Sequence, residues 1–140
     1  MAKNTGKASE DKWEAHFTSL GKQAYFYRVV DAAEVRGRTG KIGFIRPAPS
    51  DYVLVHRGRT SFAEVKSTQN PTSFPFSLLR VVQSSIATRV LAAGGDYDVY
   101  AHNLITDVWY KFPYQLVVAT KDAGRASIPW SQLQDFIYVL

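Results

Sequence analysis

The sequence predicts a single α/β domain in which a mixed central sheet is flanked by helices. A chain of 140 residues, 46% of them hydrophobic, is long enough to bury a core and short enough to form one domain. The runs 52–56 and 60–66 carry apolar residues on both faces, which is typical of central strands covered by other elements. Apolar residues at helical spacing before and after these runs predict the covering helices.

The N-terminal stretch predicts a flexible arm, a helix and a strand. Residues 1–8 are small, polar and basic, so we expect the folded domain to cover 9–140. Ser9 is the expected N-cap of the helix, and Gly21 ends it. The aromatic and β-branched run 24–30 predicts the first strand. The buried stripe of the helix consists of Trp13, Phe17 and Leu20.

A polar connection with glycines at its bends follows the first strand, over residues 31–48. Its cations could contact the phosphates of a nucleic acid. Alternatively, it is a solvated surface loop whose few apolar residues pack back on the domain. The cations are Arg36, Arg38, Lys41 and Arg46.

A β-hairpin with charged residues at one end is the most informative feature of the chain. Asp51 precedes the run 52–56, a turn at 57–59 follows, and the second run ends in Glu64-Val65-Lys66. Strands joined by a tight turn are antiparallel, so the start of the first lies beside the end of the second. We therefore expect Asp51 beside Glu64. Because side chains alternate along a strand, Lys66 shares the face of Glu64.

Two carboxylates and one amine at a common point predict a divalent-cation site. Carboxylate oxygens are the hard ligands that Mg²⁺ prefers, and the bound ion can activate water against a phosphodiester. The competing interpretation is a structural ion pair between Lys66 and one of the acids.

A second helix is predicted over residues 75–93, because a proline suits its first turn and glycines close it. Thr72 or Ser73 would cap it, and its N-terminal amides could receive a phosphate. Gln83 interrupts the apolar stripe and is expected to point toward the sheet, either into a functional site or onto backbone groups at the core edge. The stripe consists of Leu79, Val82, Ile86 and Val90.

The remaining pattern predicts strands at 97–102 and 108–112 and a terminal helix or docking segment at 129–137. The net charge of +5 suits a polyanionic partner. The chain has no cysteine, which excludes disulfides and thiolate metal sites, and its scattered histidines argue against zinc. It has neither an apolar run of membrane-spanning length nor a signal peptide, so we expect an intracellular protein.

The order Pro49-Ser50-Asp51, a gap, then Glu64-Val65-Lys66 resembles the PD-(D/E)XK nuclease superfamily, whose core has Pro-Asp and then acid-x-Lys. The inserted Ser50 is a variation that the superfamily tolerates. Over about residues 4–116 the chain also resembles the RecU-type Holliday junction resolvases, through Ser73-Phe74-Pro75 and Gln83. It resembles the archaeal Hjc resolvases more loosely, through the active-site residues alone.

The resemblance implies a restriction-endonuclease-like core and an endonuclease that uses Mg²⁺, with Mn²⁺ able to substitute. The implied metal ligands are Asp51, Glu64, the Val65 carbonyl and a third acid, Glu10, with Glu14 as its rival. Lys66 and Gln83 would complete the catalytic set. The segment 31–48 takes the place of the family's junction-probing stalk in shortened form. The implied DNA contacts are Arg36, Arg38, Lys41, Arg46, Arg57, Arg59, Ser73 and Arg80.

The resemblance also implies partners and a setting. The implied substrate is branched DNA, above all four-way junctions cut in recombination and repair, and the implied assembly is a homodimer without a membrane. The implied location is the cytoplasm of a bacterial cell or a phage-infected host. Two alternatives stay open: another nuclease or nickase of the superfamily acting on duplex or branched DNA, and a non-catalytic DNA-binding module whose charged hairpin end is only an ion pair.

Overall fold

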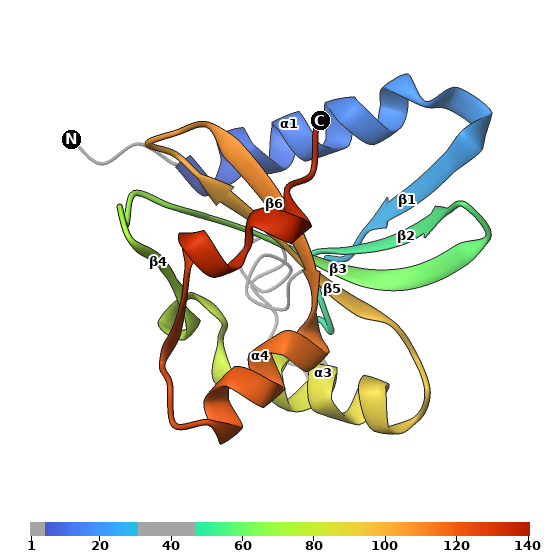
Figure 1. Ribbon diagram of the computed structural model, residues 1–140. Helices are drawn as coiled ribbons and strands as arrows, with labels where there is room; N and C mark the ends of the chain where they lie inside the picture. The colour runs from blue at the N-terminus through green and yellow to red at the C-terminus, as the bar shows by residue number, and fades with distance from the viewer. Residues whose placement is uncertain (1–4, 31–46) are drawn as a thin grey trace, which may run out of the picture.

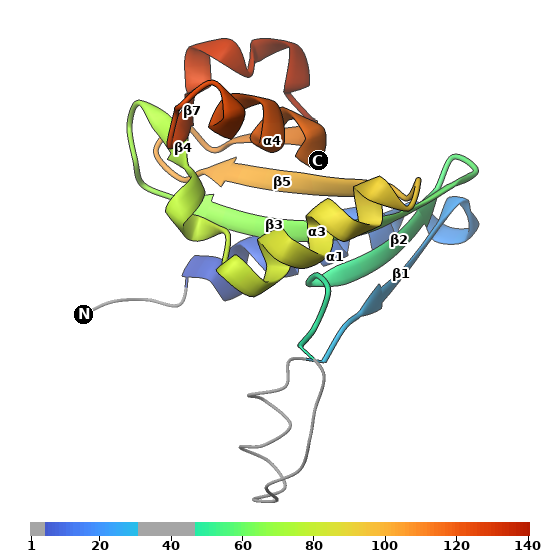
Figure 2. The same ribbon diagram turned by 90° about the horizontal axis from the view of Figure 1, so that it is seen from below.

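A computed structural model describes residues 5–30 and 47–140, and within these ranges the fold is a mixed five-stranded sheet between two layers of helices. The strand order is β1-β2-β3-β5-β6. Figures 1 and 2 show α1 on one face of the sheet and α3 and α4 on the other. The helices are α1 (Thr5–Ser19), α3 (Val81–Ala92) and α4 (Tyr114–Asp122). The sheet strands are β1 (Ala24–Arg28), β2 (Tyr52–His56), β3 (Arg59–Thr68), β5 (Tyr97–Asn103) and β6 (Val108–Pro113).

Short elements complete the chain. A small second sheet pairs β4 (Ser73–Pro75) with β7 (Ser127–Pro129) in antiparallel fashion. The 3₁₀ turns are η1 (Gly21–Gln23), η2 (Phe76–Leu78), η3 (Trp130–Gln132) and η4 (Gln134–Phe136). No helix in the described ranges is both long enough and apolar enough to cross a bilayer.

The sheet is mixed, as predicted, because one of its pairings is parallel. β1, β2 and β3 form an antiparallel meander, β3 and β5 run parallel, and β5 and β6 form a second antiparallel hairpin. The parallel pair needs a crossover, and α3 supplies it on the way from β3 to β5. The fold class predicted from the sequence is therefore confirmed.

Each face of the sheet carries its own apolar core. On the α1 side, Trp13 and Phe17 pack against side chains of β2, β3, β5 and β6, and Trp13 stacks on Tyr52 with ring centroids 4.3 Å apart. On the other side, α3 and α4 pack with β4 and β7 over alternate residues of β5 and β6. The first helix therefore covers the face opposite that of the two later helices.

The hairpin β2–β3 has the predicted form, with a tighter turn. Arg57 and Gly58 both have positive φ, 55° and 74°, which is the backbone of the two-residue turn that matches strand twist. Arg59 already belongs to β3, and β3 continues to Thr68, beyond the predicted end at residue 66.

The first helix begins earlier than predicted. Residues 5–8 are helical and do not belong to an arm, and Lys7 pairs with Asp11 one turn later, at 3.3 Å. Ser9 therefore cannot be the N-cap. It lies inside the helix, only 1% exposed, and bonds to a residue of β5.

The second predicted helix was wrong in its first turn and at Val82 of its stripe, whereas Leu79 and Val90 contact the core as predicted. Residues 73–75 are extended and pair with β7, because Phe74 is fully buried in the core and Pro75 has an extended backbone. The helix α3 begins only at residue 81. Val82 is 47% exposed, and the buried face of α3 is formed by Gln83 and Ala87.

Candidate active site

The hairpin brings Asp51 and Glu64 together at its open end. Tyr52 pairs with Ala63 across β2 and β3, so Asp51, one residue earlier, meets Glu64, one residue later. The Asp51 N–H donates to Glu64 Oε1 at 2.9 Å, and the Val65 N–H donates to Asp51 Oδ2 at 2.8 Å. One oxygen of Glu64 thereby holds the backbone of Asp51, one oxygen of Asp51 holds the backbone of Val65, and the second oxygen of each carboxylate is left for other partners.

The backbone around Asp51 is held from three strands. The Val29 N–H, just after β1, donates to the Asp51 carbonyl at 2.9 Å. The Tyr97 hydroxyl, on β5, donates to the Pro49 carbonyl at 2.6 Å, and the buried Ser50 hydroxyl donates to the Tyr52 carbonyl at 2.7 Å. Ser50, which separates Pro49 from Asp51, therefore has a structural role. Sequence reasoning missed Tyr97, because nothing local in the sequence links it to Pro49.

Lys66 lies on the same face as Glu64, as the alternation predicts. Its Nζ is 3.3 Å from Glu64 Oε2, and the two side chains are 19% and 1% exposed. Oε2 is nevertheless buried without a hydrogen-bond partner, so the ammonium is near it but not well directed. The ion pair that competes with the metal interpretation is present, yet one ammonium serves two carboxylates and leaves a buried oxygen unsatisfied.

Burial disfavours the ionised form of both Asp51 and Glu64. Burial, with Asp51 adding like-charge repulsion, raises the pKa of Glu64 to about 7, although Lys66 opposes the rise. Burial likewise raises the pKa of Asp51, against the opposing effects of Lys66 and the Val65 N–H. A carboxyl group with a pKa near 7 holds a proton that a cation can displace.

Glu10 lies within the electrostatic reach of this pair, and Glu14 is engaged elsewhere. Burial and the charge of Asp51 raise the pKa of Glu10, and Arg28 and Lys66 oppose the rise. Arg28 Nη2 is 3.6 Å from Glu10 Oε1. Glu14 instead accepts a hydrogen bond from the Tyr52 hydroxyl at 2.5 Å. Glu10 therefore remains the candidate for the third acid.

Arg80 and Gln83, at the start of α3, were both predicted to serve the site. The charge of Arg80, which precedes the helix, lowers the pKa of Asp51. Gln83 is 5% exposed, and its Oε1 is buried without a hydrogen-bond partner. The predicted inward orientation of Gln83 is confirmed. Ser73 lies earlier in the chain, on β4, where its N–H donates to the Asn70 side chain at 3.0 Å.

Two of the predicted DNA contacts lie at the opposite end of the hairpin from the acid pair, and their contact with DNA stays a prediction. Arg57 and Arg59 stand at the turn, and β2, five residues long, separates them from Asp51 by roughly 17 Å. The Arg59 guanidinium is also occupied, because it bonds to Asp98 at 2.5 and 3.2 Å and to Asp96 at 3.0 Å. Four further predicted contacts lie outside the described residues: Arg36, Arg38, Lys41 and Arg46.

The donor set fits a magnesium ion. In the described part of the chain, no three His, Cys, Asp or Glu side chains are already grouped to hold a metal. Mg²⁺ does not need such a group, because it keeps several waters and binds proteins through one or two carboxylates. Asp51 and Glu64 supply two, and Glu64 Oε2 is a buried oxygen that has Lys66 as an ion-pair partner but accepts no hydrogen bond.

Comparison with known proteins links this fold to a solved structure. No protein-family model matches the chain, and no curated protein matches it. Among solved structures, Archaeoglobus fulgidus Hjc, a Holliday junction resolvase from an archaeal hyperthermophile, superposes with a TM-score of 0.53 at 18% identity, covering 79% of this chain and 78% of that one. The chain therefore has the restriction-endonuclease-like fold that Hjc has. The resemblance to RecU-type enzymes stays a prediction.

Proposed function

We propose that this chain is a metal-dependent endonuclease that cuts branched DNA and resolves four-way junctions. The observation that carries the proposal is the pairing of Asp51 and Glu64, with Lys66 beside them, at the open end of a central hairpin. The fold shared with a resolvase supports the proposal. An acid pair with one buried, unsatisfied oxygen is costly unless a cation completes it.

In this proposal Asp51, Glu64 and the Val65 carbonyl hold Mg²⁺, and Glu10 is an additional acidic ligand. Mn²⁺ can replace Mg²⁺. The ion supplies a lowered pKa for bound water and charge stabilisation at the phosphate. Lys66, held beside Glu64, stabilises the charge that builds on the phosphate oxygens. Gln83, whose amide oxygen is buried and unsatisfied, orients the attacking water or the phosphate. Water adds to phosphorus as the bond to the 3′ oxygen breaks, leaving a 5′-phosphate and a 3′-hydroxyl.

The proposed substrate is recognised through its phosphates. The net charge of +5 favours a polyanion, and Arg80 places a cation near Asp51. Ser73 and the cations of the segment 31–48 stay proposed contacts. A role in recombination and repair follows from this substrate.

Resolving a junction takes two symmetric cuts, so the proposal includes a homodimer. The face of β1 and β2 opposite α1 suits a second copy of the chain. Tyr25, Tyr27 and Val55 are 63%, 55% and 38% exposed there, and Figure 2 shows this part of the sheet beside α3 without a covering helix. A phosphate backbone would need cations on this face, and these side chains carry none. Light scattering should give a dimer for the wild type and a monomer for Tyr25→Glu/Tyr27→Glu.

The experiment that tests the activity is cleavage of a labelled immobile four-way junction and of its linear duplex arms, in Mg²⁺ or in EDTA. The variant is Asp51→Asn, which keeps the shape of the side chain and removes its charge. We expect paired cuts near the crossover in Mg²⁺, none in EDTA, none by the variant and none on duplex.

Each other outcome contradicts a distinct part of the proposal. Equal cutting of duplex would retain the nuclease and remove the junction selectivity. Binding of DNA that is insensitive to metal, with no cutting in Mg²⁺ or Mn²⁺, would leave a non-catalytic DNA-binding module. Cutting that survives Asp51→Asn would move the active site elsewhere.

A further inference from the structure

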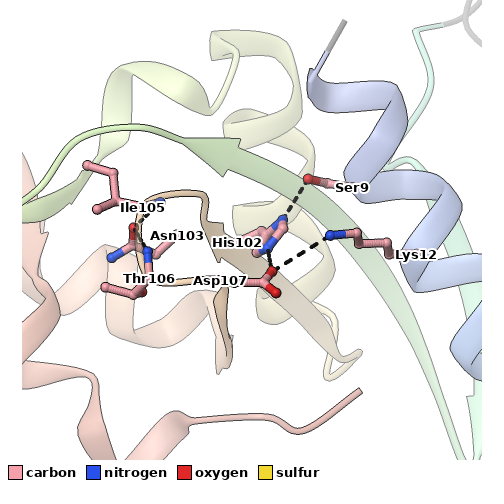
Figure 3. Close-up of polar contacts among 7 residues, drawn as sticks. All are labelled: Ser9, Lys12, His102, Asn103, Ile105, Thr106 and Asp107. Carbon is pink, nitrogen blue, oxygen red and sulfur yellow. Dashed lines mark hydrogen bonds and ion pairs between the residues drawn. The ribbon is translucent and has the colours of Figure 1, made fainter.

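A chain of polar side chains, buried at Ser9 and His102 and exposed at Asp107, joins the first helix to β5 and to the turn that follows it. Figure 3 shows Ser9, on α1, bonded to His102, on β5, which is in turn bonded to Asp107 in the β5–β6 turn. The Ser9 Oγ to His102 Nδ1 distance is 2.8 Å, and the His102 Nε2 to Asp107 Oδ1 distance is 2.7 Å. Lys12, one turn after Ser9, approaches the same Asp107 oxygen at 3.7 Å.

The chemistry of the three groups sets the direction of these bonds. Burial lowers the pKa of His102, so its ring is neutral and carries one N–H. The hydrogen bond from His102 and the charge of Lys12 lower the pKa of Asp107, which is therefore an ionised acceptor. Nε2–H accordingly donates to Asp107, and Nδ1 accepts from the Ser9 hydroxyl. Every group in the chain then has the partner that it needs.

This serine, histidine and aspartate are not the machinery of a hydrolase. Ser9 and His102 are only 1% and 2% exposed, so no substrate reaches the hydroxyl. The His102 ring is also fixed against Trp109, with ring centroids 4.4 Å apart and planes within 9° of parallel. The three side chains instead connect α1 to β5 and to the turn that follows β5.

The hydrogen bond between Ser9 and His102 lies beside an apolar core, where apolar side chains would also fill the space. Ser9 is four residues before Trp13, on the buried stripe of α1, and the neighbouring core is aromatic and aliphatic. Apolar packing alone allows a helix to slide or rotate slightly, because it is not directional. A buried hydrogen bond to Ser9 fixes the rotation of α1 about its axis and its position along that axis. Buried polar groups can provide this kind of structural specificity.

The residue most affected by that restraint is Glu10, which directly follows Ser9. Ser9 faces β5, and Glu10, about 100° further around the helix, lies toward Arg28 and Asp51. His102 pairs in register with Ser67, the residue after Lys66, so the restraint acts at the level of the acid site. Resting on the proposed function, we propose that Ser9, His102 and Asp107 are positioning residues that hold the Glu10 carboxylate at the metal site.

The test measures Mn²⁺ affinity, by electron paramagnetic resonance and by calorimetry, in the absence of DNA. Ser9→Ala should weaken binding by about tenfold, the low end of the effect of groups that orient metal ligands. Glu10→Gln should weaken it at least as much. In the Glu10→Gln background, Ser9→Ala should have no further effect beyond about twofold, because the restraint then has no carboxylate to position.

Asp107 offers a matched pair of variants. Its φ is 56°, a backbone that Asn and Gly both accept. Asp107→Asn keeps an acceptor for the His102 N–H and should retain Mn²⁺ affinity near that of the wild type. Asp107→Gly keeps the turn and removes the acceptor, so it should weaken binding in the same direction as Ser9→Ala. Circular dichroism confirms that each variant is folded.

The outcomes separate this inference from the proposed function. Wild-type affinity in Ser9→Ala, or equal weakening by Ser9→Ala with and without Glu10, would overturn the positioning role and leave the metal site intact. Weak binding by both Asp107 variants would overturn it as well. If the wild type binds no Mn²⁺, the proposed metal site itself fails, and the inference fails with it.

Discussion

The two ends of the β2–β3 hairpin carry the same kinds of charge and use them differently. At the turn, one cation, Arg59, meets Asp96 and Asp98 through hydrogen bonds that use both sides of its guanidinium. At the open end, one cation, Lys66, lies beside Glu64 and Asp51, and a buried oxygen of Glu64 stays unsatisfied.

The difference lies in the geometry of the cation and in solvent access, although Arg80 and Arg28 also act on Asp51 at the open end. An arginine presents a planar fork that matches carboxylates, whereas a lysine is a single point charge that satisfies fewer oxygens. The turn is therefore a finished structural cluster, and the open end is an incomplete one. A cluster of buried charged side chains is a candidate binding site when the groups around it do not supply all the hydrogen bonds that its charges need.

The largest expected effect comes from removing one charge at each end. Glu64→Gln should lower the rate of junction cleavage by about a thousandfold, because it removes the proposed metal ligand. Asp98→Asn makes the matched change at the turn and should leave cleavage by the folded protein unchanged. Single-turnover cleavage at saturating protein measures both. Similar losses in the two variants would refute the functional distinction between the ends.

Removing the cations gives a smaller effect. Lys66→Met should slow cleavage by about a hundredfold while Mn²⁺ still binds, since the ammonium acts on the phosphate. Arg59→Met should leave cleavage intact and lower the free energy of unfolding by about 2 kcal/mol, because Asp98 loses its partner in a buried setting. Calorimetric Mn²⁺ titration and urea unfolding distinguish the two. A Lys66→Met variant that still cuts at full rate would remove Lys66 from the catalytic set.

The pH dependence of stability tests the strain at the open end. The pKa of Glu64 is raised in the folded protein from 4.5 to about 7, so the folded state retains a proton that the unfolded state has released. The stability from this group is complete below pH 4.5 and is lost as pH rises through 7. Between pH 5 and 8 in EDTA, the wild type should lose about 2 kcal/mol more unfolding free energy than Glu64→Gln. Identical profiles from urea unfolding would contradict this account.

The smallest expected effect is the stabilisation by the metal itself. At a tenfold excess of Mg²⁺ over its Kd, binding should raise the unfolding free energy of the wild type by about 1.4 kcal/mol. Glu64→Gln should lose this gain, and Asp98→Asn should keep it. Thermal unfolding with and without Mg²⁺ measures all three. A gain that persists in Glu64→Gln would place the ion outside the proposed site.

The parts of the site that were predicted correctly are close together in the sequence. Asp51 and Glu64 are 13 residues apart, and a two-residue turn with alternating strands is enough to bring them together. The Glu64 and Lys66 relationship needs only the two-residue period of a strand. Local rules were therefore sufficient for the acid pair, its lysine and the hairpin that carries them.

The features that were not predicted correctly depend on residues that are far apart in the sequence. The helix predicted from residue 75 begins only at residue 81, and the strand β4 before it pairs with residues 127–129, which no local sequence pattern predicts. The hydrogen bonds of Arg59 to Asp98 were not predicted, because Asp98 lies 39 residues away. Ser9 was expected to cap a helix because its partner, His102, is 93 residues away.

The sequence by itself therefore determined the hairpin, the identity of the acids and the class of fold, because periodicity and turn chemistry act over a few residues. Only the tertiary structure decided which charges are already satisfied. Arg59 and Lys66 are both cations of one strand, and long-range packing alone gives the first a complete set of carboxylates while it leaves a buried oxygen beside the second. Satisfaction of a buried charge depends on every group around it, and those groups come from the whole chain.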